Sequence, residues 1–187
     1  MDAMAVAQRM TAQEYLAIPF DEVRTQLVEG EVVLNESIRL HQVVLWDIAR
    51  ALDTWVLAAP GRGGTSLPID VLIDERNVFG SDLLWYADGR VPGRRDQRPY
   101  PVPDLAVEVR SPSTWRYDIG AKKSAYERNG LPELWLVDTS ADEVLVFRRS
   151  APACPSFDVA LELGRRDTLA SPLLPGFALR LDGLFAD

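Results

Sequence analysis

The stretch from Val102 to Asp138 constrains the fold most, because it reads as a strand, a loop, a helix and a second strand in succession. Its apolar runs are residues 105–109 and 134–137. Between them, Asn129-Gly130 ends a helix, since both residues tolerate the left-handed conformation needed just past a helix end. Two apolar runs separated by a helix of this length predict a βαβ unit with mostly buried strands. The sequence therefore predicts an α/β fold.

Glu108 interrupts the first apolar run, and a carboxylate inside a buried strand is costly unless it binds something. One interpretation is an ion pair with a nearby Lys or Arg. The other is a metal site, because the following helix carries Lys122 and, four residues earlier, Asp118. Acidic side chains hold a hard cation such as Mg²⁺ through oxygen ligands, and a lysine helps position or deprotonate an attacking water. This combination favours the metal site.

The same string resembles the signature of the Uma-two family, a bacterial group of restriction-endonuclease-like proteins in the PD-(D/E)XK nuclease superfamily. The signature is roughly E-V-x-S-P-S-T, then D-x-x-x-K, x-x-x-Y, and x-G-x-x-E-x-W-x-V-D. The resemblance covers about residues 11–148 and implies a restriction-endonuclease-like core, with a mixed central β-sheet flanked by helices. The matching positions are Glu108, Ser111, Pro112, Ser113, Thr114, Asp118, Lys122, Tyr126, Gly130, Glu133, Trp135 and Asp138.

The resemblance implies a two-acid metal site. Ser81-Asp82 stands where the family usually has Pro-Asp, so Asp82 is the first metal acid and Glu108 the second. The Val109 backbone carbonyl is the third expected ligand, and Lys122 orients or activates water. The expected metal is Mg²⁺, with Mn²⁺ as a substitute.

The literal Pro103-Asp104 motif before Glu108 does not fit a shared cation. On a strand, a rise of ~3.3 Å per residue separates Asp104 from Glu108 by ~13 Å, whereas ligands lie ~2.0–2.6 Å from the ion. Arg110 also occupies the place of the motif's lysine, and arginine is a poor base. The first acid must therefore come from a neighbouring strand, which favours Asp82, and Lys122 on the helix is the better lysine. Lys123 is expected to face solvent.

Other residues are expected to support the site or the substrate. Glu29, in the predicted turn Glu29-Gly30-Glu31, is a candidate catalytic acid by resemblance, although turn carboxylates are more often simply solvated. His41 lies on the apolar stripe of a predicted helix and is expected to be structural or substrate-orienting. Asp118 is expected to orient Lys122 or cap its helix. The remaining supporting candidates are Arg110, Ser111 and Tyr126.

The rest of the chain is expected to add elements around this core. Thr11 and Glu14 form a capping box for a helix over residues 11–18. A second helix is expected over residues 38–56. Strands are expected at residues 23–28, 32–34, 69–73, 83–86 and 143–148, and residues 60–64 form a turn. The tail beyond Ser150 contains additional strands or a dimer arm, with apolar segments at residues 157–163 and 173–184.

Length and composition favour a single cytoplasmic domain. The 187 residues suit one domain over residues 1–187, with a loose leader at 1–10 and a C-terminal region at 150–187. No apolar run approaches the ~20 residues that cross a bilayer, and the N-terminus lacks signal-peptide features. A single cysteine, Cys154, excludes an internal disulfide, and one cysteine with one histidine excludes a dedicated zinc site.

The net charge of −8 argues against a broadly electropositive DNA-binding surface, although a local basic cluster can still contact phosphate. The leading hypothesis is a Mg²⁺-dependent endonuclease that hydrolyses DNA phosphodiester bonds and forms a homo-oligomer, expected to be a dimer. The alternative is a catalytically silent nuclease-fold module that binds nucleic acid or a protein partner. The basic clusters are Arg90, Arg94, Arg95 and Arg98; Arg110, Arg116, Lys122 and Lys123; Arg148 and Arg149; and Arg165 and Arg166.

Overall fold

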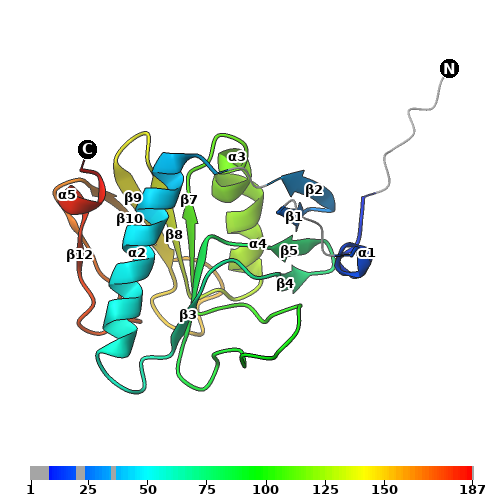
Figure 1. Cartoon of the computed structure of the whole chain (residues 1–187), viewed down its shortest axis with the longest axis horizontal. Helices are drawn as coiled ribbons and strands as arrows, with labels where there is room; N and C mark the ends of the chain where they lie inside the picture. The colour runs from blue at the N-terminus through cyan, green and yellow to red at the C-terminus, as the bar shows by residue number, and fades with distance from the viewer. Residues whose placement is uncertain (1–8, 20–23, 35–36, 187) are drawn as a thin grey trace.

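A six-stranded mixed β-sheet forms the centre of the protein. The computed structural model describes residues 9–19, 24–34 and 37–186. The strand order is β10-β9-β8-β7-β6-β3, and only β7 and β8 pair in parallel (Figure 1). This confirms the predicted α/β fold with a mixed central sheet. The strands are β3 (Gly64–Ser66), β6 (Leu83–Tyr86), β7 (Leu105–Val109), β8 (Glu133–Asp138), β9 (Glu143–Arg148) and β10 (Val159–Gly164).

The predicted βαβ unit supplies the two innermost strands. Every residue of β7 and β8 is buried, and their parallel register places Glu108 beside Leu136. The connection is a short helix α3 (Trp115–Tyr117), a π-helical turn η1 (Asp118–Lys122) and α4 (Lys123–Arg128). Buried strands of this kind require apolar residues throughout, so the carboxylate of Glu108 is the exception that the fold must accommodate.

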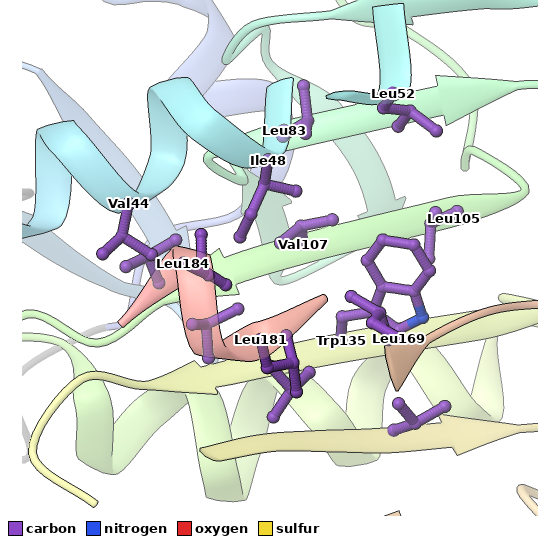
Figure 2. Close-up of a cluster of buried hydrophobic side chains, with 14 of the residues drawn as sticks. Val44, Ile48, Leu52, Leu83, Leu105, Val107, Trp135, Leu169, Leu181 and Leu184 are labelled. Carbon is purple, nitrogen blue, oxygen red and sulfur yellow. The ribbon is translucent and has the colours of Figure 1, made fainter. Parts of the chain in front are cut away.

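Helix α2 (Arg39–Leu57) covers one face of the sheet, and α4 lies on the other (Figure 1). The alternation of side chains along β7 sends Leu105, Val107 and Val109 toward α2 and Ala106 toward α4. Glu108 therefore shares the α4 face. Figure 2 shows the α2 side of this core, with Val44, Ile48, Leu52, Leu83, Leu105, Val107, Trp135, Leu169, Leu181 and Leu184.

A second, four-stranded antiparallel sheet of order β2-β1-β5-β4 packs beside the α4 face. It contains β1 (Thr25–Val28), β2 (Glu31–Leu34), β4 (Val71–Asp74) and β5 (Asn77–Phe79). Gly30 turns the β1–β2 hairpin at φ 80°, and a Cβ there would lie 2.6 Å from the Arg9 side chain, so this turn requires glycine. Helix α1 (Ala12–Ala17) begins with the predicted capping box of Thr11 and Glu14.

The C-terminal tail completes the chain's own core. It forms β10, the short pair β11 (Thr168–Leu169) and β12 (Leu179–Arg180), and helix α5 (Leu181–Leu184). Apolar side chains of this tail pack against α2 and the central sheet, and Ser171 donates a hydrogen bond of 2.7 Å to the buried Glu133 carboxylate. The tail thus contributes additional strands, which was one of the two alternatives predicted for it.

Several elements differ from the sequence-based expectations. Strands β3 and β5 were not predicted; Gly64 begins β3 instead of ending the turn. The strand predicted over residues 69–73 begins two residues later, at Val71. Val23 of the predicted hairpin and residues 1–8 of the predicted leader lie outside the described residues. Among the residues that the structure describes, no helix combines the length and the apolar character needed to span a membrane.

Candidate active site

The pairing of β6 with β7 brings Asp82 and Glu108 together. Leu83 pairs with Val107, so one further step along this antiparallel ladder sets Asp82 opposite Glu108. Opposite residues of an antiparallel pair project from the same face of the sheet. The Val109 backbone N–H donates a 2.8 Å hydrogen bond to Asp82 Oδ2, which fixes this carboxylate at the end of β7. Two acids that lie 26 positions apart in sequence therefore meet at one point.

Lys122 is the cation at the centre of the site. Its Nζ lies 2.6 Å from Glu108 Oε1 and 2.9 Å from Asp118 Oδ1. The residue Lys122 is 1% exposed, and the residues Glu108 and Asp118 are 3% and 2% exposed, so all three charged groups are buried. Such burial is tolerated only when opposite charges compensate each other. The structure thus shows that the ion-pair interpretation of Glu108 holds, with Lys122 as its partner.

The π-helical turn and the loop before it hold Asp118 and Lys122 in place. Thr114 Oγ1 donates a 3.0 Å hydrogen bond to Asp118 Oδ2, and Ser111 Oγ lies 2.7 Å from Thr114 Oγ1. All of these groups are buried. The π-helical turn spans Asp118–Lys122, and such turns occur frequently at functional sites. The S-P-S-T string of the sequence therefore builds a hydroxyl chain that orients Asp118, and Asp118 in turn orients Lys122.

Burial and charge shift the proton affinities of this cluster. Burial raises the pKa of Glu108 to about 7; Lys122 opposes this rise, and the charges of Asp118 and Asp82 add to it. Burial alone would lower the pKa of Lys122, but Asp118 and Glu108 outweigh it and raise that pKa above its usual value. Lys122 is therefore protonated at neutral pH in this arrangement, and it is unsuited to accept a proton from water.

His41, near the start of α2, contacts the first acid. Its Nε2 lies 3.0 Å from Asp82 Oδ2, and its side chain is buried. Burial lowers the pKa of His41, but the hydrogen bond and charge of Asp82, with the charges of Glu108 and Asp118, raise the pKa overall. Sequence reasoning placed His41 on a structural stripe and did not foresee this bond, because it joins α2 to the start of β6 across 41 positions.

The cluster has an excess of negative charge. Two buried carboxylates, of Glu108 and Asp118, contact the Lys122 ammonium group, and the buried Asp82 carboxylate lies near them with His41 beside it. Within the described residues, Glu108 Oε1 and Asp118 Oδ1 both contact Lys122 Nζ, whereas His41 Nδ1 is buried and makes no hydrogen bond. No three His, Cys, Asp or Glu side chains in the described ranges form a ready metal-binding group. The arrangement fits a cation that takes two carboxylates and completes its coordination with backbone oxygen and water, as Mg²⁺ commonly does.

Tyr126 ties the Lys122 helix to the strand of Asp82. Its hydroxyl makes a short hydrogen bond with Ser81 Oγ, and both side chains are fully buried. Burial raises the pKa of the Tyr126 hydroxyl, which therefore keeps its proton. Because Ser81 directly precedes Asp82, this bond fixes the backbone at the first acid. The hydroxyl of Ser81 is what makes the bond available.

We expect Tyr126→Phe to lower the free energy of unfolding by about 1–2 kcal/mol, because it leaves the buried Ser81 hydroxyl without its partner. Urea unfolding measures this loss. Tyr117→Phe is the matched control, since the Tyr117 hydroxyl accepts an exposed hydrogen bond from Arg116, and this substitution should change stability by less than about 0.5 kcal/mol. Equal losses in the two variants would contradict a structural role for the Ser81–Tyr126 bond.

Other predicted site residues lie outside this cluster. Glu29 is exposed in the β1–β2 turn, and within the described part of the chain its carboxylate makes no hydrogen bond or ion pair with Asp82, Glu108 or Lys122; its catalytic role stays a prediction. Arg110 pairs with Asp138 at 2.8 Å. Asp104 accepts a 2.8 Å hydrogen bond from the Ala87 N–H at the far end of β7, away from Glu108.

The sequence predicts that Lys123 faces solvent, but the structure buries part of this side chain. It is half-buried, and its Nζ lies 4.4 Å from the centre of the Phe147 ring. The lysine stem covers apolar surface on β9 while the ammonium group sits over the ring, which a charge-based prediction overlooks. Lys123 is nonetheless separate from the Lys122 cluster.

Two pockets open beside the acids. The smaller, of about 150 Å³, is lined by His41, Asp82, Arg24 and three neighbouring residues of the α2 start. The larger, of about 720 Å³, includes Gly80, two residues before Asp82, and again Arg24. Asp82 and His41 thus lie at the wall of a small pocket, and Arg24 borders both pockets.

Comparison with known proteins identifies the family. The family model described as "Uma2: Putative restriction endonuclease" matches residues 12–182. The chain is a member of the Uma2 family. A crystal structure titled as a "putative nuclease" from Anabaena variabilis ATCC 29413 has a TM-score of 0.77 at 16% sequence identity, covering 94% of this chain and 97% of that chain. At this identity the likeness shows the fold. No curated protein sequence matches the chain.

Thr114 and Ser81 contact residues of the cluster described above, and the sequence-based site prediction omitted both. Thr114 lies four residues before Asp118, and side chains at this spacing lie close together in a helical segment, so the pattern contained the signal. Ser81 carried no such signal, because its partner Tyr126 lies 45 positions away.

Proposed function

We propose that this Uma2-family protein is a Mg²⁺-dependent endonuclease that hydrolyses phosphodiester bonds of DNA, with Mn²⁺ as a substitute metal. The observation that carries the proposal is the buried group of Glu108 and Asp118 paired with Lys122, beside Asp82 at the wall of a small pocket. A purely structural ion pair would need one acid and one base. The surplus of acids over bases is explained by a cation that the cluster binds during function.

Asp82 and Glu108 are the side chains that would hold the metal, with the Val109 backbone carbonyl as the further expected ligand. Their ladder positions support this assignment, because Asp82 stands opposite Glu108 and accepts the Val109 N–H. When bound, Mg²⁺ would supply electrostatic stabilisation of the charge that develops on the phosphate, and would lower the pKa of a water molecule. These expected ligands are fewer than Mg²⁺ takes, so waters and a phosphate oxygen would complete its coordination.

Lys122 would act as a charged donor in this site. Its raised pKa keeps the ammonium group protonated, so it would hydrogen-bond and position a water or a phosphate oxygen while other groups accept the proton. Thr114 donates a hydrogen bond to Asp118, and Asp118 pairs with Lys122, which keeps the ammonium group close to Glu108. His41 would keep Asp82 oriented through its 3.0 Å contact with Oδ2.

The second candidate function is a silent nuclease-fold module that binds nucleic acid or a protein partner. The net charge of −8 and the pairing of Lys122 with two acids favour it, because a paired lysine is not available to substrate in this arrangement. The retention of Asp82, Glu108 and Lys122 in one cluster favours the enzyme. A homodimer is part of the enzyme hypothesis, and light scattering would measure it.

The test combines metal binding with cleavage. We expect calorimetry to show Mg²⁺ or Mn²⁺ binding by the wild type and its loss in Asp82→Asn, which keeps the size of the side chain and removes its charge. Plasmid nicking should fall by at least about 100-fold in this variant, because the metal's stabilisation of the transition state contributes several kcal/mol.

Asp104→Asn is the matched control, since Asp104 lies at the other end of β7 and contacts Ala87 and Arg90. It should keep metal binding and nicking. Absence of metal binding by a folded wild-type sample at millimolar metal would exclude the metal-dependent enzyme and leave the silent module. Metal binding without nicking of any DNA would leave a metal-binding but non-catalytic site.

A further inference from the structure

The larger pocket lies near Asp82, and its lining is less acidic than the cluster of Asp82, Glu108 and Asp118. Its wall includes Gly80, and Arg24 is shared with the small pocket that contains Asp82. Its volume of about 720 Å³ falls within the range of pockets that hold small organic ligands. Asp82 and the larger pocket are therefore neighbours, and Arg24 borders both pockets.

The lining of the larger pocket suits an uncharged, flat group. Its charged side chains balance, with Arg24 and Arg98 against Asp70 and Asp96. Arg98 is held by Asp70 at 2.8 Å and by the Ile18 carbonyl at 2.8 Å, so this cation is already committed to the protein. The half-buried Tyr100 ring supplies an aromatic wall, and other lining residues are apolar or carry amide and hydroxyl groups. A run of phosphates would find little net attraction here, whereas a nucleobase would find apolar contact and hydrogen-bonding groups.

The acids themselves are too recessed for an intact duplex. Asp82 and Glu108 are 5% and 3% exposed, and the pocket at Asp82 measures about 150 Å³. A DNA duplex is stiff and its paired bases hold each phosphate at the rod's surface. A single strand is flexible and its bases are free to turn aside, so its backbone can enter a narrow recess.

We infer that the larger pocket binds an unpaired nucleobase of the DNA strand whose phosphate reaches Asp82 and Glu108, so that the substrate is single-stranded or locally unpaired DNA. Arg24, which borders both pockets, contacts the phosphate between the two positions. This inference rests on the proposed nuclease function, and it adds the substrate class. It also agrees with the acidic net charge of −8, because recognition relies on one base pocket and one local cation instead of a wide basic surface.

The first experiment compares binding of one fluorescein-labelled single strand with binding of the same sequence as a blunt duplex. Fluorescence anisotropy in Ca²⁺ is measured on the whole protein. We expect the single strand to bind at least about tenfold more tightly, since stacking and burial of one base are lost in the duplex. Equal or tighter binding of the duplex would overturn the inference.

The second experiment fills the pocket. A Cβ built at Gly80 meets no atom within 4 Å and the backbone there is not left-handed, so a side chain at this position can begin without a clash beside the pocket. We expect Gly80→Leu to weaken single-strand binding by about tenfold and to leave the melting temperature unchanged. Gly183→Leu on α5 is the matched control, because Gly183 also meets no atom within 4 Å and is remote from the pocket. Wild-type affinity in Gly80→Leu would overturn the pocket assignment.

Arg24 is tested by salt dependence. We expect Arg24→Ala to weaken single-strand binding and to reduce the slope of log K against log salt by about 0.7, the value for one phosphate contact on a single strand. Arg166→Ala removes the same charge from an exposed position near β11 and should change neither quantity. An unchanged slope in Arg24→Ala would overturn the phosphate contact.

Cleavage separates this inference from the proposed function. Tight single-strand binding without hydrolysis of any DNA in Mg²⁺ would contradict the nuclease and support the base pocket. Metal-dependent hydrolysis that is equally fast on duplex and single strand would support the nuclease and contradict the substrate class inferred here.

Discussion

Lys122→Met should lower the free energy of unfolding by about 3–5 kcal/mol at pH 8 in EDTA, because it leaves buried carboxylates without their cation. Glu108 Oε1 lies 2.6 Å and Asp118 Oδ1 2.9 Å from the ammonium group that the variant removes. Methionine keeps the length of the side chain, so the loss reports charge more than packing. Urea unfolding at pH 8 measures it, and DNA cleavage should be lost as well.

The same variant should regain stability as the pH falls. Without Lys122, the carboxylate of Glu108 loses the attraction that favours its charged form, so its protonation at lower pH removes a charge that burial penalises. We therefore expect the difference from wild type to shrink between pH 8 and pH 5. Lys123→Met is the control, since its ammonium group sits over Phe147 outside the cluster; it should cost less than about 1 kcal/mol at both pH values. A loss in Lys122→Met that is independent of pH would mean that packing, not charge, dominates at this position.

The central βαβ unit was predictable because its signals are local and redundant. Two apolar runs and the Asn129-Gly130 stop all pointed to the same answer, and β7, α4 and β8 follow it closely. The contact between Asp118 and Lys122 was also predictable, because residues four positions apart in one helical segment lie close together. The π-helical form of that segment was not predictable, because its bonds give no distinct residue pattern.

The unpredicted strands have weak local signals. Strand β3 consists of Gly64, Thr65 and Ser66, and its pairing with β6 alone makes it a strand. Strand β5 lies in a hairpin with β4 and pairs with β1 through Leu27 and Val78, which is a long-range contact. Sequence pattern reports burial and periodicity, and a three-residue segment is too short to show either.

In the site, too, the local features were predictable from the sequence and the long-range contacts were not. The sequence placed Glu108 and Lys122 together by motif and chemistry, and the exclusion of Asp104 agrees with its contacts at the opposite end of β7. The bond between His41 and Asp82 depends on how α2 crosses the sheet, which the spacing of apolar residues in one helix cannot specify. Likewise, the two ion-pair partners of Lys122 became visible only when strand and helix were assembled.

Glu108→Gln should have opposite effects on stability and on activity. The folded pKa of Glu108 is raised to about 7, above its ordinary value of 4.5, and burial is the main cause. The native state therefore prefers the protonated, neutral side chain, and the wild type loses stability as the pH rises from 4.5 to about 7. Glutamine resembles that neutral form at every pH. In EDTA we therefore expect the stability of the variant relative to the wild type to be higher at pH 8 than at pH 4.

Activity should move the other way. Glutamine removes the charge that would bind the metal, so we expect Mg²⁺ binding to be lost and DNA cleavage to fall by at least about 100-fold. Urea unfolding across pH 4 to 8, with calorimetry and cleavage on the same samples, measures both effects. Glu133→Gln is the control: Glu133 is also buried, with a pKa raised mainly by burial, but its partners are Ser171 and Trp135. It should keep metal binding and cleavage. A Glu108→Gln variant whose relative stability is no higher at pH 8 than at pH 4 and that still cleaves DNA would show that Glu108 is a structural ion-pair partner of Lys122, whereas a relative gain in stability at pH 8 with loss of activity identifies a charge that the fold tolerates for the reaction.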